Sequence, residues 1–135
     1  NGRLYVMGGV DCDKLQVLEM SEENEFTWTV KADMPTARYD AASAVVDGKL
    51  WVMGGSIDDD VTDNVAIYDI EADSWGTGPA LPHAARGAAH ATTHDGEVYV
   101  SFGQQGAWVY RNAAWVDWPA PARGYLPACA SIRLG

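Results

Sequence analysis

A short phrase of sequence occurs three times in this chain at nearly equal spacing. It reads GRLYVMGG at residues 2–9, GKLWVMGG at 48–55 and, less completely, GEVYVSFG at 96–103, so its first glycine recurs after 46 and then 48 residues. Such a repeat indicates one supersecondary unit used several times, each unit burying its apolar surface against the next. The repeat constrains the fold more strongly than the length of 135 residues does.

Each repeat is predicted to contain four strands. The phrase itself is rich in β-branched, aromatic and large apolar residues, and it follows an Asn-Gly or Asp-Gly pair typical of a tight type I′ hairpin. Small-residue segments precede two of these pairs, AASAVV at 41–46 and GAAHATTH at 87–94. After a polar loop come a third strand and a tryptophan-containing fourth strand: 14–20 and 26–30, 64–70 and 74–78, then 107–111 and 113–118. No stretch of a dozen residues has helical periodicity, so the predicted fold class is all-β.

This pattern resembles the kelch repeat. The resemblance is carried by glycine pairs followed by a tyrosine and a tryptophan at set offsets: Gly8, Gly9 and Trp28, then Gly54, Gly55, Tyr68 and Trp75, then Gly103, Tyr110 and Trp115. The first unit lacks the tyrosine, with Leu18 and Met20 nearby, and Phe102 replaces one glycine of the third. The resemblance implies β-propeller blades of four antiparallel strands.

These repeat residues are interpreted as structural. Two glycines at the end of a strand allow positive φ and a close approach of another backbone. The aromatic residues of the second and fourth strands are expected to pack between neighbouring blades. They are Tyr5, Trp51 and Tyr99 together with Trp28, Trp75 and Trp115.

The chain holds three blades' worth of strands. We divide it into 1–36, a blade without its first strand; 37–83 and 84–122, two complete blades; and 123–135, a first strand of a further blade or a strand that closes the ring. Propellers usually have four to eight blades, and an open arc exposes apolar blade faces. The chain is a fragment, a half-propeller that dimerises head-to-tail with 125–132 completing the partner's first blade, or part of a longer polypeptide. We expect a six-bladed ring, completed by a second copy or by further sequence.

Three arginines, Arg38, Arg86 and Arg123, each precede a small-residue strand, and the first two stand ten residues before a hairpin glycine. The resemblance implies that they ring the mouth of a central channel, since arginines near this position in similar propellers bind acidic peptide segments. In the alternative interpretation each arginine pairs with an acidic residue and fixes a loop. Tyr39, His90 and Tyr125 complete the candidate partner-binding residues.

No residue pattern predicts catalysis, a metal or a cofactor. His90 and His94 share one face of a strand but lie roughly 13 Å apart at the usual strand rise, too far to bind one metal. The acidic segment SIDDDVTDN at 56–64 lacks the glycine and the terminal glutamate of an EF-hand loop and is interpreted as a solvated loop. Nucleophile and phosphate-loop motifs are absent from the sequence.

A net charge of −10 disfavours nucleic acid and anionic membranes as partners. No segment approaches the ~18 apolar residues of a membrane helix. Cys12 and Cys129 match no zinc pattern and are expected to be free thiols. The sequence does not determine the cellular compartment, and the cytoplasm is slightly favoured.

The favoured function is that of a protein–protein interaction module, a propeller scaffold that presents its loops and channel mouth to a partner protein. An acidic segment of the partner is one candidate for the bound part. The alternative is a small-molecule enzyme at the channel mouth, such as a kelch-type sugar mutarotase or a lyase-like modifier. A third is a purely architectural role. Binding is favoured over catalysis because AASAVV and YLPACASI place no carboxylate or histidine beside the arginines.

Overall fold

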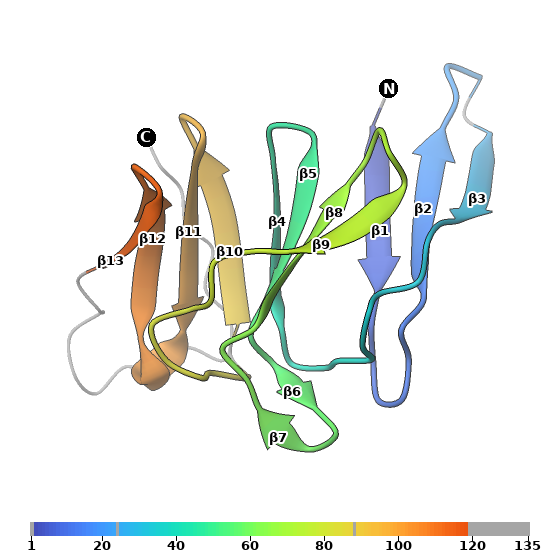
Figure 1. The fold of residues 1–135 in the computed structure, drawn as a ribbon. Coiled ribbons are helices and arrows are strands. Elements are labelled where there is room, and N and C mark those ends of the chain that lie inside the picture. The colour runs from blue at the N-terminus through green and yellow to red at the C-terminus, as the bar shows by residue number, and fades with distance from the viewer. Residues whose placement is uncertain (1, 24, 88, 119–135) are drawn as a thin grey trace.

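The described residues fold into three antiparallel sheets of three or four strands that stand one after another in an arc, with a further two-stranded sheet in one loop (Figure 1). The computed structural model describes residues 2–23, 25–87 and 89–118. The first sheet has three strands, and the second and third have four each. All three follow chain order from the inside of the arc outward, as expected of kelch-type blades.

The strands agree closely with those predicted. In the first sheet they are β1 (Arg3–Met7), β2 (Leu15–Met20) and β3 (Phe26–Val30). In the second they are β4 (Ala42–Val46), β5 (Lys49–Met53), β8 (Val65–Asp69) and β9 (Ser74–Thr77). In the third they are β10 (Ala89–His94), β11 (Glu97–Phe102), β12 (Ala107–Arg111) and β13 (Ala114–Asp117). Hence β1, β5 and β11 are equivalent, and β4 and β10 are the inner strands.

The Asp-Gly pairs form the predicted tight hairpins. Asp47 and Gly48, between β4 and β5, have φ of 49° and 71°, and Asp95 and Gly96, between β10 and β11, have 49° and 78°. Positive φ at both central residues is the type I′ requirement. The hairpin fixes the pairing of a small-residue strand with a large-residue strand, for example Ala44 opposite Trp51.

The acidic segment at 56–64 is more ordered than the predicted solvated loop. It contains a second, small hairpin, β6 (Ser56–Ile57) paired with β7 (Asp60–Val61), with Asp58 and Asp59 at its turn. In Figure 1 this hairpin extends beyond the ends of β4 and β5. At the corresponding place in the third sheet, Gly103–Gln105 form a short 3-10 turn, η1.

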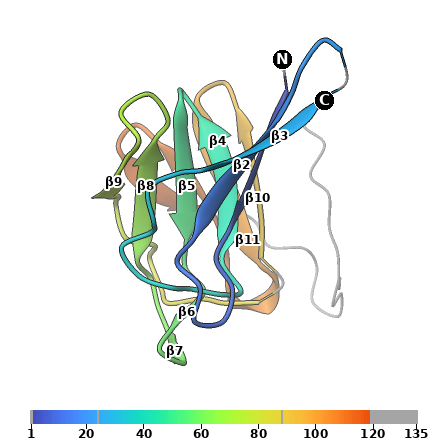
Figure 2. The same ribbon diagram turned by 90° about the vertical axis from the view of Figure 1, so that its right-hand side faces the viewer.

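The sheets pack face against face through two apolar clusters (Figure 2). Between the first and second sheets lie Leu15, Met34, Leu50, Val52 and Tyr68, all buried. Between the second and third lie Trp51, Met53, Val65, Val98, Val100, Phe102 and Trp108, also buried. The second sheet thus contributes alternate residues of β5 to opposite clusters, as the two-residue period of a strand dictates.

The glycine pairs occupy places where one blade approaches the next. Gly54 has φ of 63°, and a Cβ built on it would lie 2.6 Å from the carbonyl oxygen of Ala85 and 2.9 Å from the Phe102 ring. A Cβ on Gly8, in the first sheet, would lie 2.6 Å from the carbonyl oxygen of Arg38. The predicted close approach of another backbone is therefore confirmed at both glycines.

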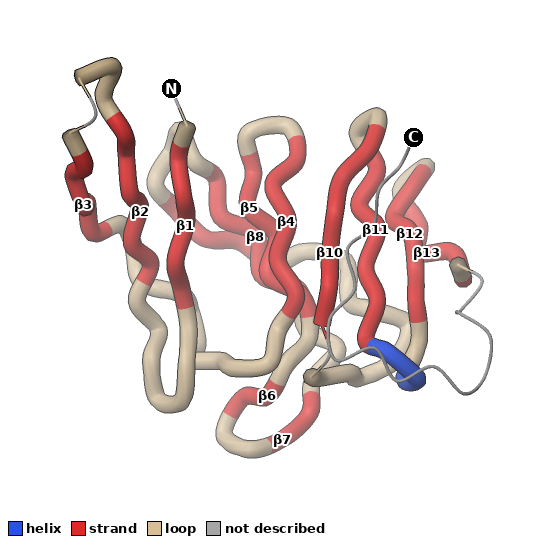
Figure 3. Tube along the Cα trace, turned by 180° about the vertical axis from the view of Figure 1, so that it is seen from behind, coloured by secondary structure: helices blue, strands red, loops and turns tan. Residues whose placement is uncertain are grey.

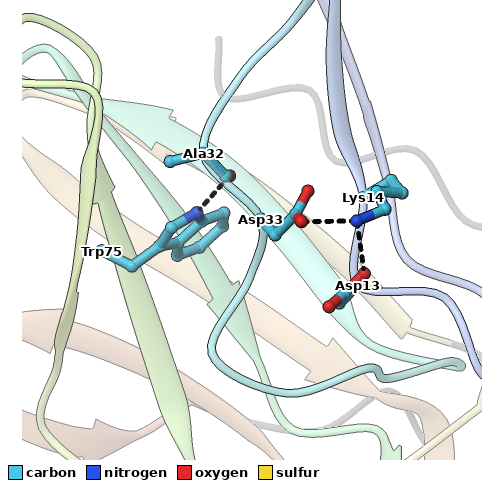
Figure 4. Close-up of polar contacts among 5 residues, drawn as sticks. All are labelled: Asp13, Lys14, Ala32, Asp33 and Trp75. Carbon is cyan, nitrogen blue, oxygen red and sulfur yellow. Dashed lines mark hydrogen bonds and ion pairs between the residues drawn. The ribbon is translucent and has the colours of Figure 1, made fainter.

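Two of the three repeat tryptophans join neighbouring blades as predicted. The indole N–H of Trp75 donates to the carbonyl oxygen of Ala32 at 2.8 Å, and that of Trp115 donates to the carbonyl oxygen of Pro79 at 3.0 Å. Each acceptor lies just after the last strand of the preceding sheet. Figure 4 shows the first contact beside the Lys14–Asp33 and Lys14–Asp13 ion pairs, which connect the loops of the first sheet.

The first sheet is only half covered. Its face toward the second sheet carries the buried Leu15 and Val17, but the opposite face exposes Leu4, Val6 and Trp28. Trp28 pairs with Leu18 across β3 and β2, as Trp75 pairs with Tyr68, so Leu18 occupies the position of the missing tyrosine. No helix in the described ranges is long and apolar enough to cross a membrane.

Candidate functional site

The candidate site is the end of the second and third blades that carries the glycine pairs and the β6–β7 hairpin. We call it the loop face and define it by Tyr39, Ser56, Asp59, Arg86 and Gln105. These residues come from the segments that enter the inner strands and from the loops that follow β5 and β11. Local backbone pairing holds both kinds of segment in place.

Tyr39 is fixed to the β6–β7 hairpin by its backbone and its side chain. Its N–H donates to Ser56 O at 3.2 Å, and Ser56 N–H donates to Tyr39 O at 2.8 Å. The Tyr39 hydroxyl donates to Asp59 Oδ1 at 2.8 Å. That bond to a carboxylate, with a smaller contribution from burial, raises the pKa of Tyr39 above the usual value, so the ring stays a neutral donor.

Arg86 is the exposed cation of this face. Its backbone N–H donates to Gln105 Oε1 at 3.1 Å, and the Gln105 amide donates back to Arg86 O. The guanidinium Nη1 donates to Ser56 Oγ at 3.1 Å, and Arg86 forms no ion pair with any described residue. A guanidinium has five N–H donors, so most of those of Arg86 remain available.

Arg38 occupies a different environment, because its side chain is only 3% exposed. Nη1 donates to the carbonyl oxygens of Gly54 and Asn64 at 3.3 and 3.1 Å, and Nη2 donates to Asn64 Oδ1 at 2.6 Å. Desolvation by burial lowers the pKa of Arg38, which still leaves a guanidinium charged at neutral pH. Arg38 fixes the loop after β5, as in the alternative interpretation of the arginines, but through carbonyl and amide oxygens instead of carboxylates.

The difference between the two arginines corrects the register that their sequence spacing suggested. Gly55 N–H donates to Ala85 O just as Gly9 N–H donates to Arg38 O, so Ala85 is the structural equivalent of Arg38. Asp40 and Gly87, two residues farther along in each blade, both have positive φ and are therefore equivalent as well. Arg86 is therefore equivalent to Tyr39. The offset arises because β10 has six residues and β4 has five, so counting back from the hairpin glycine displaces the alignment by one.

The remaining candidates are distributed differently. His90 is half-buried on the inner strand β10. Arg123 and Tyr125 lie outside the described residues, as do Cys129 and the predicted strand 125–132. Cys12 is a free thiol. Within the described ranges, no three His, Cys, Asp or Glu side chains lie close enough to hold a metal ion.

Three residues that shape this face, Ser56, Asn64 and Gln105, were not predicted from the sequence. Ser56 is fully buried and accepts the bond from Arg86, and Asn64 accepts two bonds from Arg38. Ser56 lies one residue after Gly55, and Gln105 lies two residues after Gly103, the equivalent glycine of the third blade. That recurrence was a usable signal, because polar residues at such loop positions commonly bond the backbone.

A groove of about 400 Å³ lies on the inner side of the arc, between the first and second blades. β1 contributes Tyr5, Val6 and Met7 to its lining, and the chain that enters β4 contributes Tyr39 and Asp40. Ser43 of β4 and Arg38 also line it. In Figure 3 the inner strands β4 and β10 run side by side, and β1 follows on the other side of β4.

Comparison with known proteins gives consistent matches. The family model described as the kelch motif matches residues 37–82. An F-box/kelch-repeat protein of Arabidopsis thaliana is 31% identical over 131 residues, covering 92% of this chain and 31% of that protein. Kelch-like protein 35 of Mus musculus is 32% identical over 130 residues, covering 89% of this chain and 22% of that protein. The solved structure of YjhT is 26% identical with a TM-score of 0.62, covering 75% of this chain and 30% of that one. The chain thus spans about a third or less of the length of these proteins.

Proposed function

Because this chain belongs to the kelch-repeat family, we propose that it is a protein-interaction module whose loop face binds a segment of a partner protein. The observation that carries the proposal is that Arg86 has an exposed guanidinium and is held in position by Gln105 and Ser56. Gln105 holds its backbone and Ser56 Oγ accepts a bond from its guanidinium, so the side chain loses less freedom on binding than an unrestrained arginine would. The names of the relatives, F-box/kelch-repeat and kelch-like, support an interaction role more than a catalytic one.

The chemistry of Arg86 favours a carboxylate on the partner. A guanidinium fork binds a carboxylate through two parallel bonds, and the buried Ser56 hydroxyl orients the fork. Tyr39 adds an aromatic surface next to it whose hydroxyl is already bonded to Asp59. The acidic β6–β7 hairpin stands close by, so we expect the partner segment to carry one well-placed acidic residue and not a long acidic run.

The test compares Arg86 with two other cations of the same chain. A fluorescently labelled peptide with a single central Glu, and its Gln counterpart, are titrated with each variant. Loss of one charge-assisted contact is worth about 1.5–3 kcal/mol, so Arg86→Ala should weaken binding of the Glu peptide by tenfold or more. Lys49→Ala is the matched control, because Lys49 is exposed and lies at the opposite end of β5.

Arg38→Ala provides the contrasting case. Removing a buried guanidinium takes away the donor to Gly54 O and to Asn64 Oδ1, so this variant should lose thermal stability, which Arg86→Ala should retain. Equal affinity of Arg86→Ala and Lys49→Ala for the Glu peptide would contradict the proposed role of Arg86. So would preferential binding of the Gln peptide.

A further inference from the structure

The buried guanidinium of Arg38 has no counter-ion among the described residues. Arg38 is 3% exposed, and its hydrogen bonds go to Gly54 O, Asn64 O and Asn64 Oδ1, none of which is charged. In the part of the chain that the structure describes, Arg38 forms no ion pair, and its Nε has no hydrogen-bond partner. A buried charge is costly unless an opposite charge compensates it. The described surroundings of Arg38 thus lack a negative charge.

The third blade shows that the fold does not require a charge at this place. Ala85 is the structural equivalent of Arg38, and Phe102 stands where the second blade has Gly54. Ala85 and Phe102 are both fully buried in the apolar cluster between the second and third blades. Well-packed apolar residues often replace buried charged groups without loss of stability. The charge of Arg38 therefore calls for an explanation beyond packing.

A pocket of about 290 Å³ adjoins Arg38. All of its lining residues belong to the segment that joins the first blade to the second or to the second blade itself. They include Arg38 and four uncharged polar residues, Thr36, Thr62, Asn64 and Thr77, whereas no Asp or Glu of the described ranges lines the pocket. The pocket therefore combines groups that can donate hydrogen bonds with an absence of negative charge.

Asn64 connects the guanidinium to the pocket. Its Oδ1 accepts from Arg38 Nη2 at 2.6 Å, which leaves its amide nitrogen as a donor, and no described residue accepts from that nitrogen. An amide whose oxygen accepts a charge-assisted bond is polarised and donates more strongly. Thr62 Oγ1 accepts from the Asn64 backbone N–H at 3.1 Å, so its hydroxyl hydrogen is also left to donate. The positive charge of Arg38 is thus transmitted to the pocket through Asn64.

We propose that this pocket binds a small carboxylate, which accepts hydrogen bonds from the Asn64 amide and the threonine hydroxyls and supplies the negative charge that Arg38 lacks. A carboxylate has two oxygens with about four lone-pair sites, so it satisfies several converging donors at once. Water would satisfy the donors but would leave the charge uncompensated. The site is separate from the loop face, because neither Tyr39 nor Arg86 lines the pocket.

The decisive experiment supplies the negative charge from within the chain. A ligand that binds only the folded chain raises its melting temperature, so sodium acetate should stabilise the unmodified chain relative to sodium chloride at the same ionic strength. Asn64→Asp keeps an oxygen that accepts from Arg38 and adds a carboxylate beside it. This variant should melt at a higher temperature than the unmodified chain in sodium chloride and should lose the response to acetate.

Asn112→Asp is the matched control, because it makes the same change in the exposed turn between β12 and β13. It adds the same charge to the chain but should keep the response to acetate. Absence of any stabilisation of the unmodified chain by acetate would overturn the proposal. Equal responses of Asn64→Asp and Asn112→Asp to acetate would overturn it as well.

Nuclear magnetic resonance of the Asn64 side-chain amide reports on this pocket directly. Its signal should shift as acetate is added, and Thr77→Val should weaken the binding of acetate about fivefold, because it removes one neutral hydrogen bond. Thr27→Val, the same change at an exposed position of β3 away from the pocket, should leave the affinity unchanged. An end-blocked peptide with a single Glu separates two sources of the carboxylate. A shift caused by the peptide indicates a carboxylate carried on a protein chain, and a shift caused by acetate alone indicates a free small acid. No shift with either probe would contradict the proposed site.

Discussion

Gly54 has a backbone conformation and a close contact that together exclude any side chain. Its φ is 63°, and a Cβ would lie 2.6 Å from the carbonyl oxygen of Ala85 in the next blade's entry segment. Gly54→Ala should therefore lower the free energy of unfolding by about 2–4 kcal/mol, from left-handed strain and steric overlap combined. Urea unfolding followed by tryptophan fluorescence measures the change.

Gly48→Ala separates the two causes. Gly48 has a similar φ of 71°, but a Cβ built on it has no neighbour within 4 Å. We expect a cost of about 1–2 kcal/mol for the backbone conformation alone. Equal losses at the two positions would mean that the approach of Ala85 contributes nothing to the requirement for glycine at Gly54.

Single residues also mark the limit of what the sequence could predict. The glycine pairs and the repeat tryptophans were predictable because their positions recur and their physical requirements are local. The environments of Arg38 and Arg86 were not, because both stand ten residues before a hairpin glycine and differ only through one extra residue in β10. One position decides whether an arginine lies buried against the loop after β5 or exposed at the loop face.

Between elements, Asp73 joins the second blade to the segment that follows β3. Its Oδ1 accepts bonds from the Ala32 N–H at 2.9 Å and from the Tyr68 hydroxyl at 2.7 Å. These two bonds, the Ala32 N–H first, lower the pKa of Asp73 below its usual value. The same contact and, more strongly, burial raise the pKa of Tyr68. Folding therefore favours the ionised form of Asp73.

The sign of the resulting pH dependence follows from linkage. A carboxyl whose pKa is lower in the folded state contributes its full stability above the unfolded pKa, about 3.9 for Asp, and loses it as pH falls through the folded pKa. Asp73→Asn keeps an oxygen that can accept the Ala32 N–H but removes the titration. Urea unfolding from about pH 6 down to about pH 2 should show a shallower loss of stability in Asp73→Asn than in the unmodified chain. Parallel pH profiles would contradict the assignment.

The order and bounds of the blade strands could be predicted because each strand has its own local signal: small residues before Asp-Gly, large ones after it, then tyrosine and tryptophan. The β6–β7 hairpin could not, since three aspartates in succession give a weak strand signal. Its pairing depends on Tyr39, which bonds Ser56 from outside the hairpin.

Cross-strand ion pairs were not predicted from the sequence either. Arg3–Glu19, Lys49–Asp69 and Glu97–Arg111 occupy equivalent positions in the three blades, with the sign reversed in the third.

At the scale of the whole molecule, three blades form an arc in which only the second has a neighbouring blade on both described faces. Each residue of β5 from Leu50 to Met53 is buried, whereas β1 alternates between exposed and half-buried residues. A repeat unit cannot bury its apolar face alone, so stability depends on the neighbour. The face of the first blade that carries Leu4, Val6 and Trp28 therefore has less of its apolar surface buried than either face of the second blade.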